Sequence, residues 1–297
     1  MTRGLSSRFQ DAIILAMEHS IGIPRRLREI PDAPKKLHMR GTLPADNLFH
    51  LTVIGSRKYT QYGKIACEML IEGLKGYPFV IISGLALGMD TVALETAIRV
   101  GLPTIAFPGS GLSDSAIYPR ANVLLAHTIV ERGGCLISEF ENDFKATNWS
   151  FPRRNRLMAG MSDAVLVIEA ENKSGTRITA KLATEYNRDV LSVPGPITSD
   201  YSGGTNQLLR EGATPITCVQ DILEHFHIET QTPGSFNVDD LDLTDNERVL
   251  MKQLIAPIPK GDLIKTSGLL VHEANVALST LEIKGLIKEE LGEVRRV

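Results

Sequence analysis

The sequence predicts an α/β fold in which helices cover both faces of a parallel sheet, followed by a small winged-helix-like domain. Six short apolar runs rich in β-branched residues recur between residues 51 and 193, and helical stretches follow them. Such near-continuous apolar strands are typical of parallel sheets buried on both faces. After residue 242, three short helical segments precede two strand-like runs, which is the order of a winged-helix module.

Length and composition are those of an ordinary globular protein. The 297 residues suggest two domains, and 43% apolar with 23% charged residues excludes disorder, a coiled coil and collagen. A membrane helix requires a run of about 18 apolar residues, and the sequence contains no such run. A signal peptide requires an apolar segment near its start, and none follows the first four residues. We therefore expect a cytoplasmic protein without a membrane segment.

The three cysteines, Cys67, Cys135 and Cys218, are far apart and form no CxxC pair. Three scattered cysteines match neither the even-numbered sets of a disulfide framework nor the CxxC spacing of a zinc site. We therefore expect buried thiols and no metal site.

The N-terminal region, residues 1–47, reads as a lead-in to the first domain. Residues 1–20 resemble a short amphipathic helix, with Phe9, Ile13, Ile14 and Met17 near helical spacing. Residues 22–47 are rich in proline and basic residues and predict an irregular segment.

Residues 48–227 carry the alternating pattern and form the predicted sheet domain. The expected strands are 51–55, 79–83, 104–107, 135–138, 164–168 and 190–193. The expected helices between them are 61–76, 89–100, 121–132 and 179–187. Ligands of such sheets bind at the carboxyl ends of the strands.

A linker is predicted at 228–242, where periodicity is lost and Thr, Pro, Gly, Asn and Asp accumulate. Residues 243–297 then form the winged-helix-like domain, with helices at 246–254, 263–267 and 273–284 and a hairpin of 286–289 with 293–296. The third helix carries Glu273 and Glu282 but only Lys284, so it fits a DNA major groove poorly. We expect this domain to contact protein.

Charge is balanced, with 32 basic and 35 acidic residues and a net charge of −3. Residues 239–297 hold eight basic and eleven acidic residues, so the remaining chain carries equal numbers of both signs. A site for nucleic acid must therefore be a local cluster in the larger part.

Small-residue loops follow three of the predicted strands. Backbone N–H groups without Cβ obstruction, beside helix N-termini, form anion sites. The alternative is that glycine only permits a tight turn, but three such loops at one sheet edge favour phosphate binding. The candidate residues are Gly55, Ser56 and Arg57, then Ser83 and Gly84, then Gly109, Ser110 and Gly111.

An arginine-rich segment follows Trp149. Guanidinium groups pair with phosphates, and exposed rings stack on bases. A solvated helix start is the alternative, and the two interpretations are compatible because Pro152 suits a first helical turn. The candidate residues are Phe151, Arg153, Arg154, Asn155 and Arg156, with Tyr118 and Arg120 adding a further ring and charge.

No catalytic constellation is visible, so the sequence predicts a protein that is not an enzyme and has no cofactor. The seven histidines are scattered, and neither a dinucleotide fingerprint nor a P-loop occurs. Asp90 is expected at a helix N-terminus, satisfied by backbone donors. Glu139 and Glu169 end strands and are expected to pair with the arginines.

Several segments, in this order and spacing, resemble the DNA-processing protein A (DprA/Smf) family of single-strand DNA binders. The carrying segments are Gly55-Ser56-Arg57, Ser83-Gly84-Leu85-Ala86, Gly109-Ser110-Gly111-Leu112, Tyr118-Pro119-Arg120 with Asn122, Phe151-Pro152-Arg153-Arg154-Asn155-Arg156, and Ser174-Gly175-Thr176.

The resemblance implies an extended Rossmann-like domain without nucleotide chemistry, which binds single-stranded DNA in a basic pocket. It also implies a homodimer that loads the RecA recombinase in transformation and recombination. Arg57 and Arg120 match positions of DNA-phosphate contacts, and Asn122, Ser174 and Thr176 belong to the same implied site.

Two positions depart from the family pattern. Leu87 stands where an arginine or lysine is usual, and Leu94 replaces a usual histidine. These departures motivate the alternative of a ligand-sensing paralogue. A further alternative is a nucleotide-binding or nucleotide-hydrolysing enzyme of related Rossmann-like fold. Nucleotide-hydrolysing enzymes of this kind typically carry a Pro-Gly-Gly-x-Gly-Thr loop, and this sequence contains no such loop.

Overall fold

The computed structural model describes residues 19–172, 174–228, 243–254, 258–290 and 292–296. The chain divides into two compact units, Met1–Ile228 and Glu229–Val297. Most of the helix expected at 1–20 and nearly all of the predicted linker lie outside the described residues. His19–Ile21, at the end of the expected helix, is a strand.

Unit 1 is built on a nine-stranded sheet in the order β1-β2-β6-β5-β4-β3-β7-β8-β9. The run from β6 to β9 is parallel, whereas β2 pairs antiparallel with β6 and β1 with β2. The α/β class is confirmed, with the correction that the sheet is mixed. The strands are β1 (His19–Ile21), β2 (Leu37–Gly41), β3 (Phe49–Ile54), β4 (Phe79–Ser83), β5 (Thr104–Ala106), β6 (Cys135–Ser138), β7 (Ala164–Val167), β8 (Asp189–Ser192) and β9 (Thr214–Pro215).

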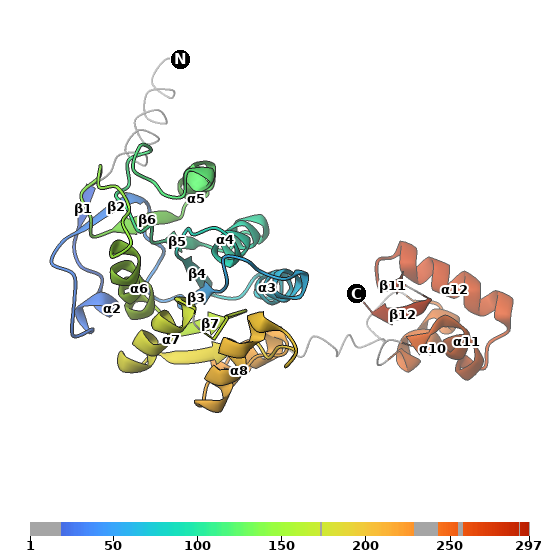
Figure 1. Ribbon diagram of the computed structural model, residues 1–297. Coiled ribbons are helices and arrows are strands. Elements are labelled where there is room, and N and C mark those ends of the chain that lie inside the picture. Colours follow the sequence, from blue (N-terminus) through green and yellow to red (C-terminus); the bar gives the residue numbers. More distant parts are fainter. Residues whose placement is uncertain (1–18, 173, 229–242, 255–257, 291, 297) are drawn as a thin grey trace, which may run out of the picture. The chain divides into compact units, whose positions relative to one another are not determined.

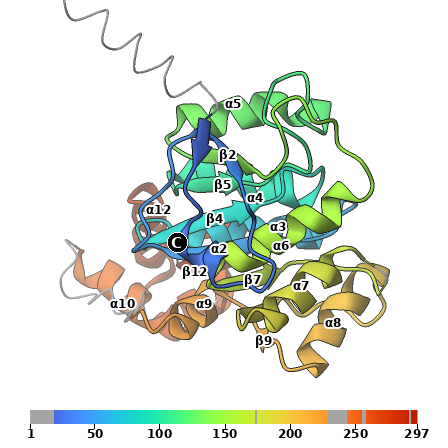
Figure 2. The ribbon, with the colours of Figure 1, turned by 90° about the vertical axis from the view of Figure 1, so that its left-hand side faces the viewer.

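Helices cover both faces of this sheet, with α3, α4 and α5 on one side and α2, α6 and α7 on the other (Figure 1). Figure 2 views the second side, where α2 and α6 lie in front of the strands. The helices of unit 1 are α2 (Arg25–Arg28), α3 (Gln61–Gly73), α4 (Met89–Val100), α5 (Val123–Glu131), α6 (Ser150–Met161), α7 (Thr176–Glu185), α8 (Gly203–Arg210) and α9 (Val219–His225).

Alternation along the central strands builds a core on each face. Ile81 of β4 packs in the cluster that contains α3 and α4 residues, and its neighbour Ile82 packs in the opposite cluster with α6 residues. Both side chains are fully buried. This two-sided burial explains why the strands are apolar throughout rather than alternating.

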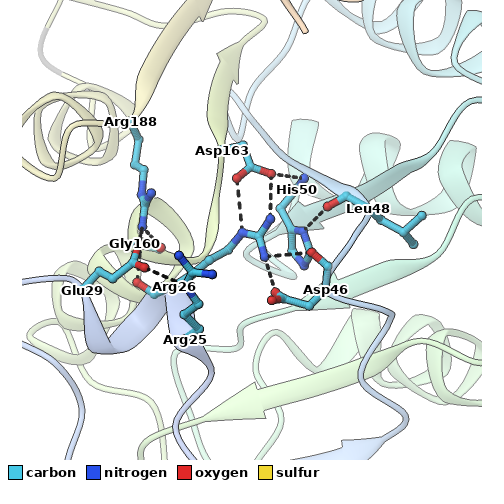
Figure 3. A network of polar contacts seen from close by, with 9 residues as sticks. All are labelled: Arg25, Arg26, Glu29, Asp46, Leu48, His50, Gly160, Asp163 and Arg188. Carbon is cyan, nitrogen blue, oxygen red and sulfur yellow. Dashed lines mark hydrogen bonds and ion pairs between the residues drawn. The ribbon is translucent and has the colours of Figure 1, made fainter. Parts of the chain in front are cut away.

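The N-terminal lead-in was expected to be irregular, and this is wrong for its central part. Residues 37–41 form β2, which extends the sheet beyond β6. The segment is also tied down by charge, because Arg26 of α2 pairs with both Asp163 and Asp46 (Figure 3). Arg188 likewise pairs with Glu29, so α2 is fixed to the sheet domain.

Unit 2 has three helices and a three-stranded antiparallel sheet in the order β10-β12-β11. Its core contains Leu250, Leu263, Leu278 and Leu281. The predicted helices and hairpin are present, and β10 is an addition. The elements are α10 (Asp245–Gln253), β10 (Ile258–Pro259), α11 (Lys260–Ser267), α12 (Val271–Ile283), β11 (Ile287–Glu290) and β12 (Glu293–Arg296).

No helix within the described ranges is long and apolar enough to cross a bilayer. Of the cysteines, Cys67 and Cys135 are buried as expected, whereas Cys218 is exposed.

Candidate nucleic-acid interface

A pocket of about 510 Å³ lies where β3, β4 and β7 end, and we call it the strand-end pocket. It brings together the loop after β3, part of the loop after β4, one side of α6 and the start of α7. Its lining includes Gly55, Ser56, Arg57, Lys58, Ala86, Asp90, Phe151, Arg154, Asn155, Ser174, Thr176 and Ile178. The predicted edge of the sheet is therefore hollowed at the expected place.

The loop between β4 and α4 is held rigid by buried polar groups. Asp90 Oδ2 accepts hydrogen bonds from the backbone N–H of Gly84 at 3.0 Å and of Ala86 at 3.4 Å. Asn122 Nδ2 donates to the carbonyl of Leu85 at 2.9 Å. The expectation that backbone donors satisfy Asp90 is confirmed.

Gly88 lets this loop approach the loop after β3. Its φ of +86° suits glycine, and a Cβ here would overlap the backbone of Arg57. Met89 N also donates to the carbonyl of Ser56 at 3.1 Å, so the two loops are joined directly. The position of Arg57 is thereby set by the start of α4.

Arg154 is buried and joins two strand ends. Its guanidinium donates to the carbonyls of Gly84 and Phe107, which follow β4 and β5. Burial lowers the pKa of Arg154 to about 10, with Asp90 opposing the shift. Burial likewise raises the pKa of Asp90, although the charge of Arg154 and the two backbone donors oppose it. Arg154 therefore remains charged at neutral pH and acts as a fixed support of the pocket wall.

Phe151 supplies a ring at the rim of the pocket. A Cβ on Gly109 would lie 2.5 Å from this ring. The Phe151 ring therefore packs directly on Gly109, where any other residue would collide with it. The Arg57 Cζ lies 5.4 Å from the Phe151 ring centroid, and the Tyr118 ring centroid lies 5.9 Å from it. Arg57, Tyr118, Phe151 and Arg154 also line a small adjoining pocket of about 40 Å³.

Arg57 and Lys58 are the exposed cations of the strand-end pocket. Within the described ranges neither side chain has an ion-pair partner, in contrast to most arginines of unit 1. Unpaired cations beside a partly exposed ring can bind a phosphate without first breaking an internal ion pair.

The start of α7 closes the other side of the pocket. Thr176 N donates to Ser174 Oγ at 3.1 Å, and Thr176 Oγ1 donates to the carbonyl of Gly55 at 3.2 Å. Both hydroxyls are thus already engaged, and they connect α7 to the loop after β3.

Arg153 and Arg156 face away from this pocket, contrary to the prediction of one arginine cluster. Both guanidinium groups pair with Glu139, and Arg156 also lies 3.6 Å from Asp32. They line a separate groove with Lys35. The reason is helical periodicity, since residues 151, 154 and 155 share one face of α6 while 153 and 156 share another.

Glu139 pairs with arginines as expected, but Glu169 does not. Its carboxylate accepts hydrogen bonds from the backbone N–H of Thr60 at 2.9 Å and from the hydroxyl of Thr60 at 2.5 Å. This contact fixes the residue that precedes α3.

Several other predicted residues are structural rather than accessible. The side chains of Ser83, Ser110 and Asn122 are buried and hydrogen-bonded to backbone carbonyls. Gly109 and Gly111 are also buried, because residues 139–149 cover the loop after β5. This loop therefore supports the site from within and does not line the strand-end pocket.

Arg120 is exposed but does not line the strand-end pocket, and its guanidinium donates to the carbonyl of Asp114. Sequence reasoning missed Lys58 and Ile178. Lys58 directly follows Arg57, which was a usable signal, whereas the half-exposed Ile178 lies within a helix whose outward face the sequence does not reveal.

A family model described as DNA recombination-mediator protein A matches residues 14–227. The chain belongs to this family. Members are DNA-processing and recombination-mediator proteins, and the match includes all the loops around the strand-end pocket.

Two curated relatives illustrate the similarity. Protein Smf of Escherichia coli (strain K12) is 40% identical over 202 residues, which are 68% of this chain and 54% of that protein. DNA processing protein DprA of Streptococcus pneumoniae (strain ATCC BAA-255 / R6) is 38% identical over 203 residues, covering 68% of this chain and 71% of that protein. The match therefore spans about half the length of the E. coli relative.

Solved structures of this family have the same fold. The X-ray structure of DNA processing protein A from S. pneumoniae superposes with a TM-score of 0.65 at 35% identity, covering 74% of this chain and 80% of that one. The Helicobacter pylori protein, whose structure was described for its single-stranded DNA binding mode, has a TM-score of 0.64 at 32% identity. That comparison covers 71% of this chain and 96% of the other.

Proposed function

We propose that this protein binds single-stranded DNA at the strand-end pocket with little sequence preference. The observation that carries the proposal is the exposed, unpaired Arg57 lying over the Phe151 ring. A cation and a ring in this arrangement serve the two parts that every nucleotide shares, a phosphate and a base face. The single-stranded DNA binding mode named for the H. pylori relative supports the same assignment.

The proposed contacts divide between charge and stacking. Arg57 and Lys58 pair with phosphates, while Phe151, extended by Tyr118, stacks on bases. The side chains that make these contacts are held in place by Arg154, Asp90 and Gly88. Because base edges are not read by a ring or a guanidinium used in this way, different sequences should bind alike.

The test is a fluorescence-anisotropy titration of oligo-dT at several salt concentrations, beside a duplex of equal length. Arg57→Ala should weaken binding to every sequence and reduce the slope of log affinity against log salt by about one. Arg132→Ala is the matched control, because Arg132 is an exposed arginine that directly follows the C-terminal end of α5. Equal affinity and slope for Arg57→Ala and wild type would exclude the mechanism.

We further propose that the pocket performs no bond cleavage. Its buried carboxylate, Asp90, is held by two backbone donors rather than aimed at an open position. Incubation with nucleoside monophosphates, followed by chromatography, should release no free base. Release of base that depends on Asp90 would instead favour the nucleotide-hydrolysing alternative.

The wider role is proposed from the family. We propose that the protein acts as a homodimer that delivers the bound strand to RecA, with the winged-helix-like unit 2 contacting protein. Glu273 and Glu282 on α12 disfavour duplex binding by that unit. Light scattering tests the dimer, and RecA filament growth on strands preincubated with this protein tests delivery.

A further inference from the structure

A second group of rings and one cation lies outside the strand-end pocket. Phe140 and Phe144 stack with centroids 4.5 Å apart, and the Trp149 ring lies 5.6 Å and 5.5 Å from them in edge contacts. Arg153 Cζ lies 5.9 Å from the Trp149 centroid. We call Trp149 and Arg153 the outer pair, by comparison with Phe151 and Arg57.

The outer pair is both exposed and fixed. Trp149 is 53% exposed although the two phenylalanines hold its edge. The Arg153 side chain is 54% exposed, while its guanidinium is anchored by the buried carboxylate of Glu139. An exposed indole offers a large flat ring with a polar N–H at one edge, which suits it to contacts with ligands. Anchoring also lowers the entropy that such side chains lose when they bind.

The position of the outer pair relates it to the strand-end pocket. Trp149 lies two positions before Phe151, so their Cα atoms are at most about 7 Å apart. Phe140 follows β6, which is parallel to β5, so it lies at the same carboxyl edge of the sheet as the pocket. The outer pair therefore lies at the same sheet edge as the strand-end pocket and is close to Phe151 along the chain.

We propose that Trp149 stacks on a base of the same strand that occupies the strand-end pocket, with Arg153 beside it. The proposal rests on the proposed function and extends it by one defined stacking position. The bound strand then runs from Phe151 toward β6 rather than toward α7. Indole and guanidinium planes accept any base, so the added contact increases affinity without adding sequence preference.

Fluorescence tests this position directly, because Trp149 is the single tryptophan of the chain. An oligo-dT of about 16 nucleotides should quench the tryptophan emission of the wild-type protein. The midpoint of this quenching titration should equal the midpoint of the anisotropy titration. A strand of equal length whose sites are abasic keeps its phosphates and should leave the emission unchanged. Emission that stays constant while anisotropy reports binding of oligo-dT would overturn the proposal.

Substitutions give an independent measure. Trp149→Leu keeps apolar packing on Phe140 and Phe144 but removes the stacking face, and should weaken oligo-dT binding about tenfold. Trp149→Phe should keep most of the oligo-dT affinity that Trp149→Leu loses. Met69→Ala, which removes a half-exposed side chain on α3, is the matched control and should bind like wild type.

The outcomes separate this proposal from the proposed function. Wild-type affinity in Trp149→Leu, together with a loss in Arg57→Ala, would reject the outer pair and leave the strand-end pocket standing. Absence of binding by the wild-type protein would reject both. If Trp149→Leu does not fold, the fluorescence of the wild-type protein still decides.

Discussion

Gly88 lies directly against the backbone of Arg57, and this contact joins the loops that follow β3 and β4. The φ of Gly88 is +86°, and the residue directly precedes α4 as its N-cap. A side chain at this position would push the two loops apart and displace Arg57 from the Phe151 ring.

Gly88→Ala should therefore lower both stability and single-strand affinity. Gly101→Ala is a matched control, because Gly101 has a φ of +83° but open space around its absent Cβ. Alanine costs about 1 kcal/mol in the left-handed conformation of Gly101. It costs more at Gly88, whose φ of +86° and ψ of −130° are readily adopted only by glycine. Urea unfolding should show a further loss only in Gly88→Ala, and anisotropy should show weaker binding only there. Equal behaviour of the two variants would mean that the loop contact is unimportant.

Arg154→Met should destabilise the protein by about 3 kcal/mol. The substitution leaves the carbonyls of Gly84 and Phe107 without their donor and removes the charge that faces buried Asp90. Arg154→Lys keeps the charge but not the planar fork, so it should fall between wild type and Arg154→Met. Urea unfolding measures the series, and a loss of affinity without any loss of stability would instead indicate direct contact with the strand.

Phe151→Leu should weaken oligo-dT binding about tenfold, because a stacking face is lost. Phe151→Tyr keeps the ring and should bind nearly as well as wild type. Since the ring carries no charge, the salt slope of Phe151→Leu should equal that of wild type, unlike the slope of Arg57→Ala. A changed slope in Phe151→Leu would show that the substitution disturbs the cations as well.

Acidification should destabilise unit 1 through His50. Burial and the nearby charge of Arg26 lower the pKa of His50 below its ordinary 6.5, and Nδ1 contacts the carbonyl of Leu48 at 2.8 Å (Figure 3). Below pH about 6.5 the unfolded chain takes up a proton at His50 that the folded protein does not, so the free energy of unfolding falls as the pH falls. The loss is at most about 1.4 kcal/mol per pH unit.

The measurement is thermal or urea unfolding between pH of about 7.5 and about 5.5. His50→Asn retains an amide donor near Nδ1 and should have a smaller dependence on pH than wild type. The other histidines are present in both proteins, so the difference isolates His50. Parallel pH profiles would assign the effect elsewhere.

The central strands could be predicted because their chemistry is local. The continuous apolar run from Phe79 to Ile82, followed by a serine, predicts a strand over 79–83, and the structure has a strand with these bounds. Residues 37–41 contain no β-branched side chain and were missed, because their strand is defined by pairing with β6 rather than by composition. Local propensity does not report such pairing.

The site was predicted in part for a similar reason. Loop residues such as Arg57 follow a strand end directly, so topology alone places them at the pocket. The arginines of α6 needed one further step, because only helical spacing separates Arg154 from Arg153 and Arg156. The burial of Ser110 depends on residues 139–149, which are distant in sequence and whose path no local pattern indicates.

The edge opposite β1 has a consequence for assembly. β9 is only two residues long and ends in Pro215, which has no backbone N–H to offer a neighbouring strand. Both features disfavour extension of the sheet at this edge by ladder pairing with a second copy. An association of two copies at this edge would rest on side chains, so substitutions of surface side chains, rather than changes to the backbone of β9, would test for it.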